Sequence, residues 1–205
     1  MPPIEGMLGF LGLGEWWIET FSADERKYIE TVFQPLGSTA NSRPLTIGRI
    51  AASSQTPAKL LGALIGWFRM TPLDERMTRS LADKLWEVID AEPSVLDRHF
   101  GYQALLQWSY RRRAGVPTAL AAAVTACERQ IAILEKTAAA MQQEGFGAQL
   151  PHHRGFEQLA VIREKGGDFE GAIRLAEQAG REGWNGDWVN RINRCRKKAA
   201  RESQE

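Results

Sequence analysis

The fold is decided by residues 152–188, which read HHRGFEQLAVIREKGGDFEGAIRLAEQAGREGWNGDW. Two helical segments flank the tripeptide Gly166-Gly167-Asp168 in this stretch. A glycine that ends one helix and an aspartate that caps the next are typical of a tight turn between two helices. We therefore expect helices over about 152–165 and 168–182. They should lie antiparallel, because the connection between them is so short.

The N-terminal part of the chain also contains sequence signals for helices. Residues 1–21 are glycine-rich and then aromatic, and we expect them to form a short lead-in packed on the core. Ser22 and Glu25 have the spacing of a capping box, which predicts a helix from there to about residue 33. The pairs Thr56-Pro57 and Thr71-Pro72 each predict an N-cap with a first-turn proline, and so the starts of two further helices.

The second half of the chain predicts longer helices. Residues 93–113 should pair with a long helix over 117–144, and a last helix should begin at about Gly186. Apolar alternation with a period of two residues, the mark of a half-buried strand, is absent from the sequence, and β-branched residues are scarce. We therefore predict an all-α fold of antiparallel helical hairpins without strands.

One of these hairpins resembles a known repeat. Phe156, Leu159 and Ala160 have the spacing of an aromatic residue, a leucine three positions on and a small residue four positions on. Two further small residues, Ala172 and Ala179, stand on the second helix, where small side chains let two helices approach closely. In this pattern the hairpin resembles a tetratricopeptide (TPR) unit.

The resemblance is weaker outside these positions. Arg163 replaces the family's second aromatic residue, and Trp184 stands near the place where the family usually ends with proline. An upstream copy lies 53 residues earlier, counted from Ala119 to Ala172, instead of the 34 of a regular array. That copy consists of Leu106, Tyr110, Ala119, Ala123 and Ala126. The stretch from 150 to 188 also resembles segments of uncharacterised helical proteins of bacteria and phages.

The TPR resemblance covers about residues 99–186 and implies right-handed stacking of hairpins in the C-terminal half. We expect residues 1–92 to form an N-terminal helical region packed on the repeats. Residues 93–205 should form the TPR-like hairpins with a C-terminal capping helix, and the two regions together should make one continuous globule.

The resemblance also implies a peptide-binding groove lined by the first helix of each hairpin. Aromatic and arginine side chains are the usual anchors of such interfaces. Arg111 and Arg112 have a simpler interpretation as well, since cations at a helix C-terminus are favoured by its dipole. The expected partner-binding residues are Trp108, Arg111, Arg112, Arg154, Glu157 and Glu164.

The distribution of charge suggests a second kind of partner. The formal net charge is only +1, which excludes a global attraction to nucleic acid or membranes. Residues 186–205, however, hold six Lys and Arg residues against three acidic ones. On the last helix a basic stripe lies about 110° from the apolar side, and such a stripe can bind phosphate backbones. It consists of Arg191, Arg194, Lys198 and Arg201.

No catalytic, metal or cofactor site is predicted. His152 and His153 would point about 100° apart on a helix, so that both could hardly bind one ion, and His99 is isolated in the sequence. Gly166-Gly167-Asp168 lacks the Lys-Ser/Thr that completes a phosphate-binding P-loop.

The cysteines and the hydropathy pattern suggest a compartment. Cys127 and Cys195 have no metal-site spacing and imply no disulfide framework, which favours a reducing environment. No stretch approaches the roughly 18 apolar residues needed to span a bilayer, and the N-terminus lacks a signal-peptide pattern. We expect a cytoplasmic protein that does not contact membranes.

The leading hypothesis is therefore a non-enzymatic adaptor or scaffold that binds a protein or peptide segment in a groove between helical hairpins. A nucleic-acid-associated regulator that uses the basic stripe is the first alternative. An enzyme on a helical scaffold is the second, although the sequence presents no convergent set of titratable residues. The identity of the partner and the oligomeric state stay open.

Overall fold

The computed structural model describes residues 4–39, 42–69, 71–146 and 149–202. Within these residues the chain forms eleven helices and two very short strands, so the predicted helical class is confirmed in its main feature. The chain divides into two compact units, residues 1–93 and 94–205, which are described separately.

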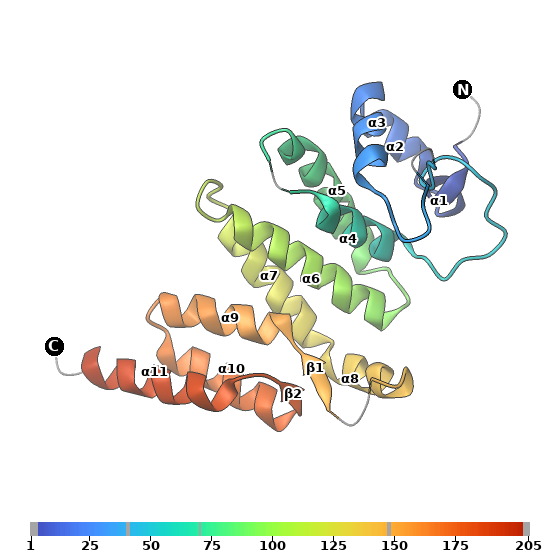
Figure 1. Cartoon of the computed structure of the whole chain (residues 1–205). Helices are drawn as coiled ribbons and strands as arrows, with labels where there is room; N and C mark the ends of the chain where they lie inside the picture. The colour runs from blue at the N-terminus through green and yellow to red at the C-terminus, as the bar shows by residue number, and fades with distance from the viewer. Residues whose placement is uncertain (1–3, 40–41, 70, 147–148, 203–205) are drawn as a thin grey trace. The chain divides into compact units, whose positions relative to one another are not determined.

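The first unit consists of five helices, drawn from blue to green in Figure 1. They are α1 (Gly6–Phe10), α2 (Gly14–Thr20), α3 (Ala23–Val32), α4 (Pro57–Trp67) and α5 (Asp74–Ile89). Helices α4 and α5 pack against each other. The core of the unit is apolar and fully enclosed; its largest buried side chains are Leu8, Trp17, Phe21, Ile29, Leu45, Leu60, Leu61, Leu64, Met77, Leu81 and Leu85.

Two of the predicted helix starts in this unit are confirmed. The Ser22 hydroxyl accepts a hydrogen bond from the Glu25 N–H at 3.3 Å, and the Glu25 carboxylate accepts one from the Ser22 N–H at 2.9 Å, which completes the capping box. The Thr56 hydroxyl caps α4 by accepting from the Lys59 N–H at 3.2 Å, with Pro57 in the first turn.

The third predicted start, at Thr71-Pro72, was wrong in its position. Helix α5 begins at Asp74, after Leu73, which makes no side-chain cap. The direction of the cap is reversed, because the Asp74 carboxylate accepts from both the N–H and the hydroxyl of Thr71, each at 2.8 Å.

The N-terminal segment contains two helices where a lead-in was expected. Helix α1 begins at Gly6, whose N–H donates to the Gly48 carbonyl at 2.8 Å, and the Leu8 N–H donates to Leu45 at 2.9 Å. Gly6 has a φ of 62°, and a Cβ there would stand 2.7 Å from the Leu45 main chain. Because this close approach of two main chains requires glycine, the glycine-rich composition that hid the helix also makes it possible.

The second unit consists of six helices and two strands, drawn from green to red in Figure 1. Helices α6 (Val95–Arg112) and α7 (Ala119–Ala132) form one pair, and α9 (Arg154–Lys165) and α10 (Phe169–Arg181) form another. Helix α7 packs on α9, and the last helix, α11 (Trp188–Glu202), packs on α10. The small residues expected at close helix approaches are buried: Ala119, Ala123, Ala126, Ala172 and Ala179.

The long helix expected over 117–144 is interrupted. Ile133, with φ −104° and ψ 10°, separates α7 from α8 (Leu134–Gln143). The break lets Leu134 and Met141 enter one buried apolar cluster with Phe156 and Trp188. Tertiary packing therefore overrides a sequence whose local pattern is helical throughout.

The expectation of no strands was also wrong. Strand β1 (Leu150–His152) pairs in parallel with β2 (Trp184–Asn185). His152 thus lies in a strand and not at a helix start, and His153 is the N-cap of α9. Strands of three and two residues are too short to show alternation, so their sequences carry no recognisable strand signal.

Candidate functional site

The surface between α9 and α11 brings three cations of α11 onto one carboxylate of α9. Glu164 accepts from Arg191 at 3.1 Å, from Arg194 at 2.9 and 3.0 Å, and from Lys198 at 2.9 Å. Residues three, four and seven positions apart share one face of a helix, which explains how all three cations reach the same acid. Glu164 was expected to bind a protein partner, and the three cations were expected to bind nucleic acid. The structure brings them together in one cluster.

The positive charges in this cluster outnumber the negative ones. The Glu164 side chain is only 8% exposed, and hydrogen bonds from Arg194 and then Lys198 lower its pKa to about 2, so it is ionised at neutral pH. The same contact raises the pKa of Arg194. Three cations around one anion leave two positive charges that this carboxylate does not balance.

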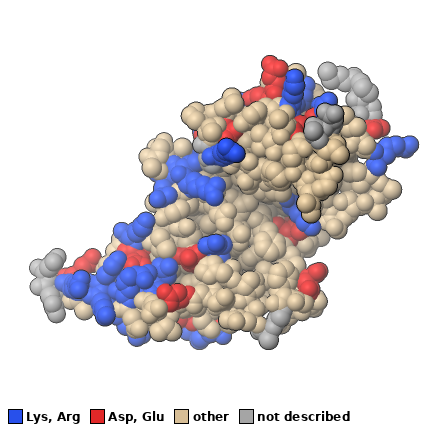
Figure 2. All heavy atoms as spheres, viewed as in Figure 1, with Lys and Arg blue, Asp and Glu red and all other residues tan. Residues whose placement is uncertain are grey.

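Further positive charge lies next to this cluster on the same helix. A surface hollow of about 380 Å³ is lined by Arg194, Lys197, Lys198 and Arg201 together with Asn190 and Asn193. None of the described residues of this lining is acidic. Figure 2 shows Lys and Arg gathered over the position of α11 in Figure 1. We call this surface, formed by residues 190–201 of α11 with Glu164, the basic face.

The N-terminal end of α9 holds a second polar group. Glu157 accepts from His152 and from Arg154, both at 2.8 Å. Burial raises the pKa of the Glu157 carboxyl, but these two hydrogen bonds outweigh it and the net shift is downward. The His152 ring stacks on the buried Trp188, with ring centroids 6.0 Å apart. Arg154 and Glu157, both expected to bind a partner, are therefore together and partly exposed.

Two of the expected anchors on α6, Trp108 and Arg112, contact each other. Trp108 is only 7% exposed, and the Arg112 guanidinium lies over its ring, 4.1 Å from the centroid. A stacked pair of this kind leaves no open indole face for a partner. Arg111, in contrast, is exposed in the last turn of α6. Of the three expected anchors on α6, Arg111 is the exposed one.

The sequence matches no family model, and neither a curated protein nor a solved structure matches the chain.

The geometry of this chain therefore has to carry the functional argument. Among the described residues, no group of three or more His, Cys, Asp or Glu side chains is placed to hold a metal ion. In the same residues, no helix is both long and apolar enough to cross a bilayer.

A buried polar cluster was missed by the sequence reasoning. The rings of His153 and of His99, which is isolated in the sequence, have centroids 5.0 Å apart, and the Trp184 ring lies 4.6 Å from that of His153. The Gln130 amide donates to the His99 carbonyl at 3.0 Å. Burial lowers the pKa of His99 to about 4 and that of His153 to about 3. Residues from α6, α7, β2 and the start of α9 meet here, so no local motif could reveal the cluster.

Four polar atoms in this cluster have no hydrogen-bond partner among the residues that the structure describes. They are Nδ1 of His99, Nε2 of His153, Oε1 of Gln130 and Nε1 of Trp184. Both histidines are almost fully enclosed, at 2% and 0% exposure, so a substrate has no direct access to them. His152 does contact a carboxylate, Glu157, but both side chains are about one-third exposed and Arg154 shares the same oxygen.

Proposed function

We propose that the chain is a non-enzymatic interaction module that binds an acidic protein or peptide segment between its C-terminal helical hairpins, along α9 and the basic face. The observation that supports this most is the surplus of positive charge around Glu164. A carboxylate-rich segment complements such a surface, and complementary charge contributes to both association rate and specificity.

The acidic segment would contact the two cations of the hollow that have no ion pair within the described residues, and further cations that are already paired. Lys197 and Arg201 line the hollow, and neither has an ion pair among the described residues. Arg154, which is exposed at the other end of α9, would contact the partner there. Glu164 would not contact the partner itself. It would orient Arg191 and Arg194, which the partner contacts.

We further propose that the α6–α7 and α9–α10 pairs are TPR-like units in right-handed stacking, with α11 as the capping helix. The buried alanines at the helix approaches support this arrangement. The polar outer side of α11 is also what a terminal cap requires for solubility. The two cysteines are free and buried, which supports a reducing compartment such as the cytoplasm.

The proposal is tested with a fluorescently labelled deca-glutamate peptide, whose binding is followed by anisotropy at low salt. The variant Lys197→Glu/Arg201→Glu places two negative charges in the hollow and leaves the ion pairs of Glu164 intact. We expect its affinity for the peptide to fall by roughly tenfold or more.

The matched control is Lys136→Glu/Arg181→Glu, which changes the net charge equally with two exposed residues outside α9 and α11. Its affinity should stay within about twofold of the unaltered protein. Equal weakening by both variants would show that only net charge matters, and absence of peptide binding would refute the proposal.

Nucleic acid is the second candidate partner, and the hollow without acidic residues favours it. Three of the four expected contacts, Arg191, Arg194 and Lys198, already bind Glu164, which reduces the charge left for phosphates. Anisotropy with a duplex DNA of about 20 base pairs, repeated at about 50 and 200 mM salt, separates the candidates. DNA binding with a steep salt dependence and no binding of deca-glutamate would replace the first proposal by the second.

A further inference from the structure

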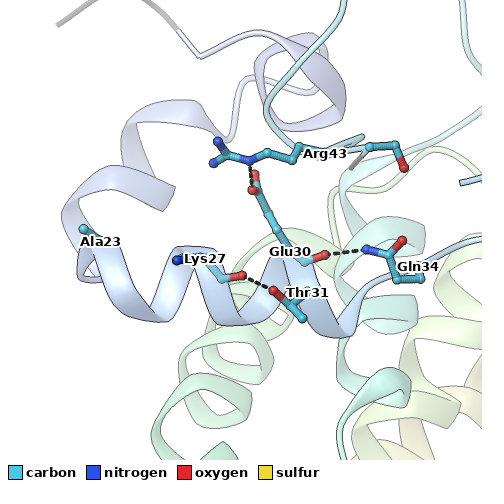
Figure 3. A pocket seen from close by; sticks show the side chains of 7 residues that line it. Ala23, Lys27, Glu30, Thr31, Gln34 and Arg43 are labelled. Atoms are coloured by element: carbon cyan, nitrogen blue, oxygen red, sulfur yellow. Dashed lines mark hydrogen bonds and ion pairs between the residues drawn. The ribbon is translucent and has the colours of Figure 1, made fainter. Parts of the chain in front are cut away.

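A hollow in the first unit lies on α3. It has a volume of about 680 Å³, within the range of small-molecule sites. One wall is a single face of α3, formed by Ala23, Lys27, Glu30 and Thr31, and it continues to Gln34 just after the helix. The other wall is formed by Ser42 and Arg43. Figure 3 shows Arg43 reaching across from the loop to Glu30.

A buried carboxylate fixes the cationic side of this cavity. Glu30 is only 4% exposed, and its two oxygens accept from Arg43 Nε and from the Thr46 hydroxyl. Both oxygens are thus occupied, so Glu30 does not offer a free acceptor to a ligand. Its role is to hold the Arg43 guanidinium in one orientation, which is how a binding group is preorganised.

Donors remain on the cations after this pairing. Arg43 binds Glu30 through Nε, and its terminal nitrogens have no acceptor among the described residues. The Lys27 ammonium likewise has no ion pair in the described part of the chain. With the charge of Glu30 balanced by Arg43, Lys27 leaves the cavity with a net positive charge. A planar guanidinium fork beside an ammonium matches the oxygens of a phosphate or carboxylate.

The remaining polar groups present acceptors instead. The Thr31 hydroxyl donates to the Lys27 carbonyl at 2.9 Å, and the Ser42 hydroxyl donates to Thr39 at 2.8 Å. The Gln34 amide donates to the Glu30 carbonyl at 2.9 Å, which leaves its oxygen free (Figure 3). Because each hydroxyl has one proton and that proton is used, Thr31 and Ser42 offer only lone pairs to a ligand, whereas Gln34 offers its oxygen and a second amide proton.

We propose that this cavity binds a small organic phosphate that carries hydroxyl groups, of the sugar-phosphate class. The phosphate would lie between Lys27 and Arg43, and the hydroxyls would donate to Thr31, Ser42 and Gln34. The division of the lining into a donor side and an acceptor side matches a ligand with both kinds of group.

Isothermal calorimetry on the full chain with ribose 5-phosphate, inorganic phosphate and ribose as separate probes tests the proposal. Ribose 5-phosphate should bind with a Kd below about 1 mM, and each of the other two should bind at least roughly tenfold more weakly. If inorganic phosphate binds as tightly as ribose 5-phosphate, the hydroxyl contacts do not exist and the assignment of the ligand class fails.

Two variants test the residues. Lys27→Met should weaken ribose 5-phosphate binding roughly tenfold, whereas Lys59→Met, which removes another exposed lysine of the same unit, should leave it within about twofold. Thr31→Val should weaken ribose 5-phosphate but not inorganic phosphate. Both Lys27 and Thr31 are exposed on α3, so the variants should fold, which far-UV circular dichroism verifies. No saturable heat with any probe, or equal effects of the two lysine variants, would overturn the proposal.

Discussion

At the scale of single residues, Glu164 is a carboxylate that links two helices, α9 and α11. It is nearly buried, and it holds three cations of α11 against α9. The sequence placed it in a groove as a contact for a partner, but it is engaged within the chain. A partner would therefore meet the arginines that Glu164 orders, and not the carboxylate itself.

We predict that Glu164→Gln destabilises the protein by about 1–2 kcal/mol at pH 7, a value reduced for the exposure of Arg194 and Lys198. The carboxyl has a pKa lowered from 4.5 to about 2, so its contribution is complete above pH 4.5 and is lost as the pH falls toward 2. The difference between variant and unaltered protein should shrink over that range. Urea unfolding at several pH values measures it.

The control for this prediction is Glu182→Gln, which removes an exposed carboxylate that has no ion pair among the described residues. It should change the free energy of unfolding by no more than about 0.5 kcal/mol. A pH-independent loss of stability in Glu164→Gln would mean that shape, and not charge, holds α11.

The buried histidines also predict a loss of stability as the pH falls, but at higher pH than Glu164 does. The pKa values of His99 and His153 are lowered from 6.5 to about 4 and about 3, so the unfolded chain takes up their protons first as the pH falls. The stabilising contribution of the two neutral histidines is therefore fully present above pH 6.5 and decreases below it. Between pH 6.5 and about 5, each histidine should cost about 2 kcal/mol, and most carboxylates stay ionised over that range.

The variant His153→Asn checks this, because asparagine keeps an N-cap for α9 but does not titrate. The dependence of its urea midpoint on pH should be about half as steep as in the unaltered protein. Equal slopes in the variant and the unaltered protein would contradict the prediction.

At the scale of elements, local signals were reliable where the local chain decides the structure. The capping box at Ser22 and the Thr56-Pro57 pair each predicted a helix start that is confirmed. The break at Ile133 and the pairing of β1 with β2 depend on contacts between distant residues, so no short-range pattern could predict them. For the same reason the cavity on α3 was not foreseen, since its second wall is a loop.

Helix α1 provides a test at this scale. Gly6→Ala should destabilise the first unit by about 2–3 kcal/mol, because it combines an unfavourable φ of 62° with a Cβ 2.7 Å from the Leu45 main chain. Gly12→Ala is the matched control, with a φ of 69° and nothing within 4 Å of the added Cβ. It should cost only about 1 kcal/mol. Thermal unfolding of both variants gives the comparison, and equal losses would show that the close approach contributes nothing.

At the scale of the whole molecule, the two units carry different surfaces. Residues 1–93 contain the cavity with Lys27 and Arg43, and residues 94–205 contain the basic face. Each unit also has apolar side chains that are enclosed within it, such as Trp17 and Leu61 in the first and Phe156 and Ala176 in the second. Small domains of this size fold alone when they bury a core of their own.

We therefore predict that residues 94–205, expressed alone, unfold cooperatively and keep their helical circular dichroism. This fragment should bind deca-glutamate within about threefold of the full chain and should not bind ribose 5-phosphate, whereas the fragment 1–93 should show the reverse. The reason is that, within the described part of the chain, each lining consists of residues of one unit. A folded fragment 94–205 that has lost the peptide would place part of the binding surface in the first unit, and a fragment without cooperative unfolding would show that the units depend on each other for stability.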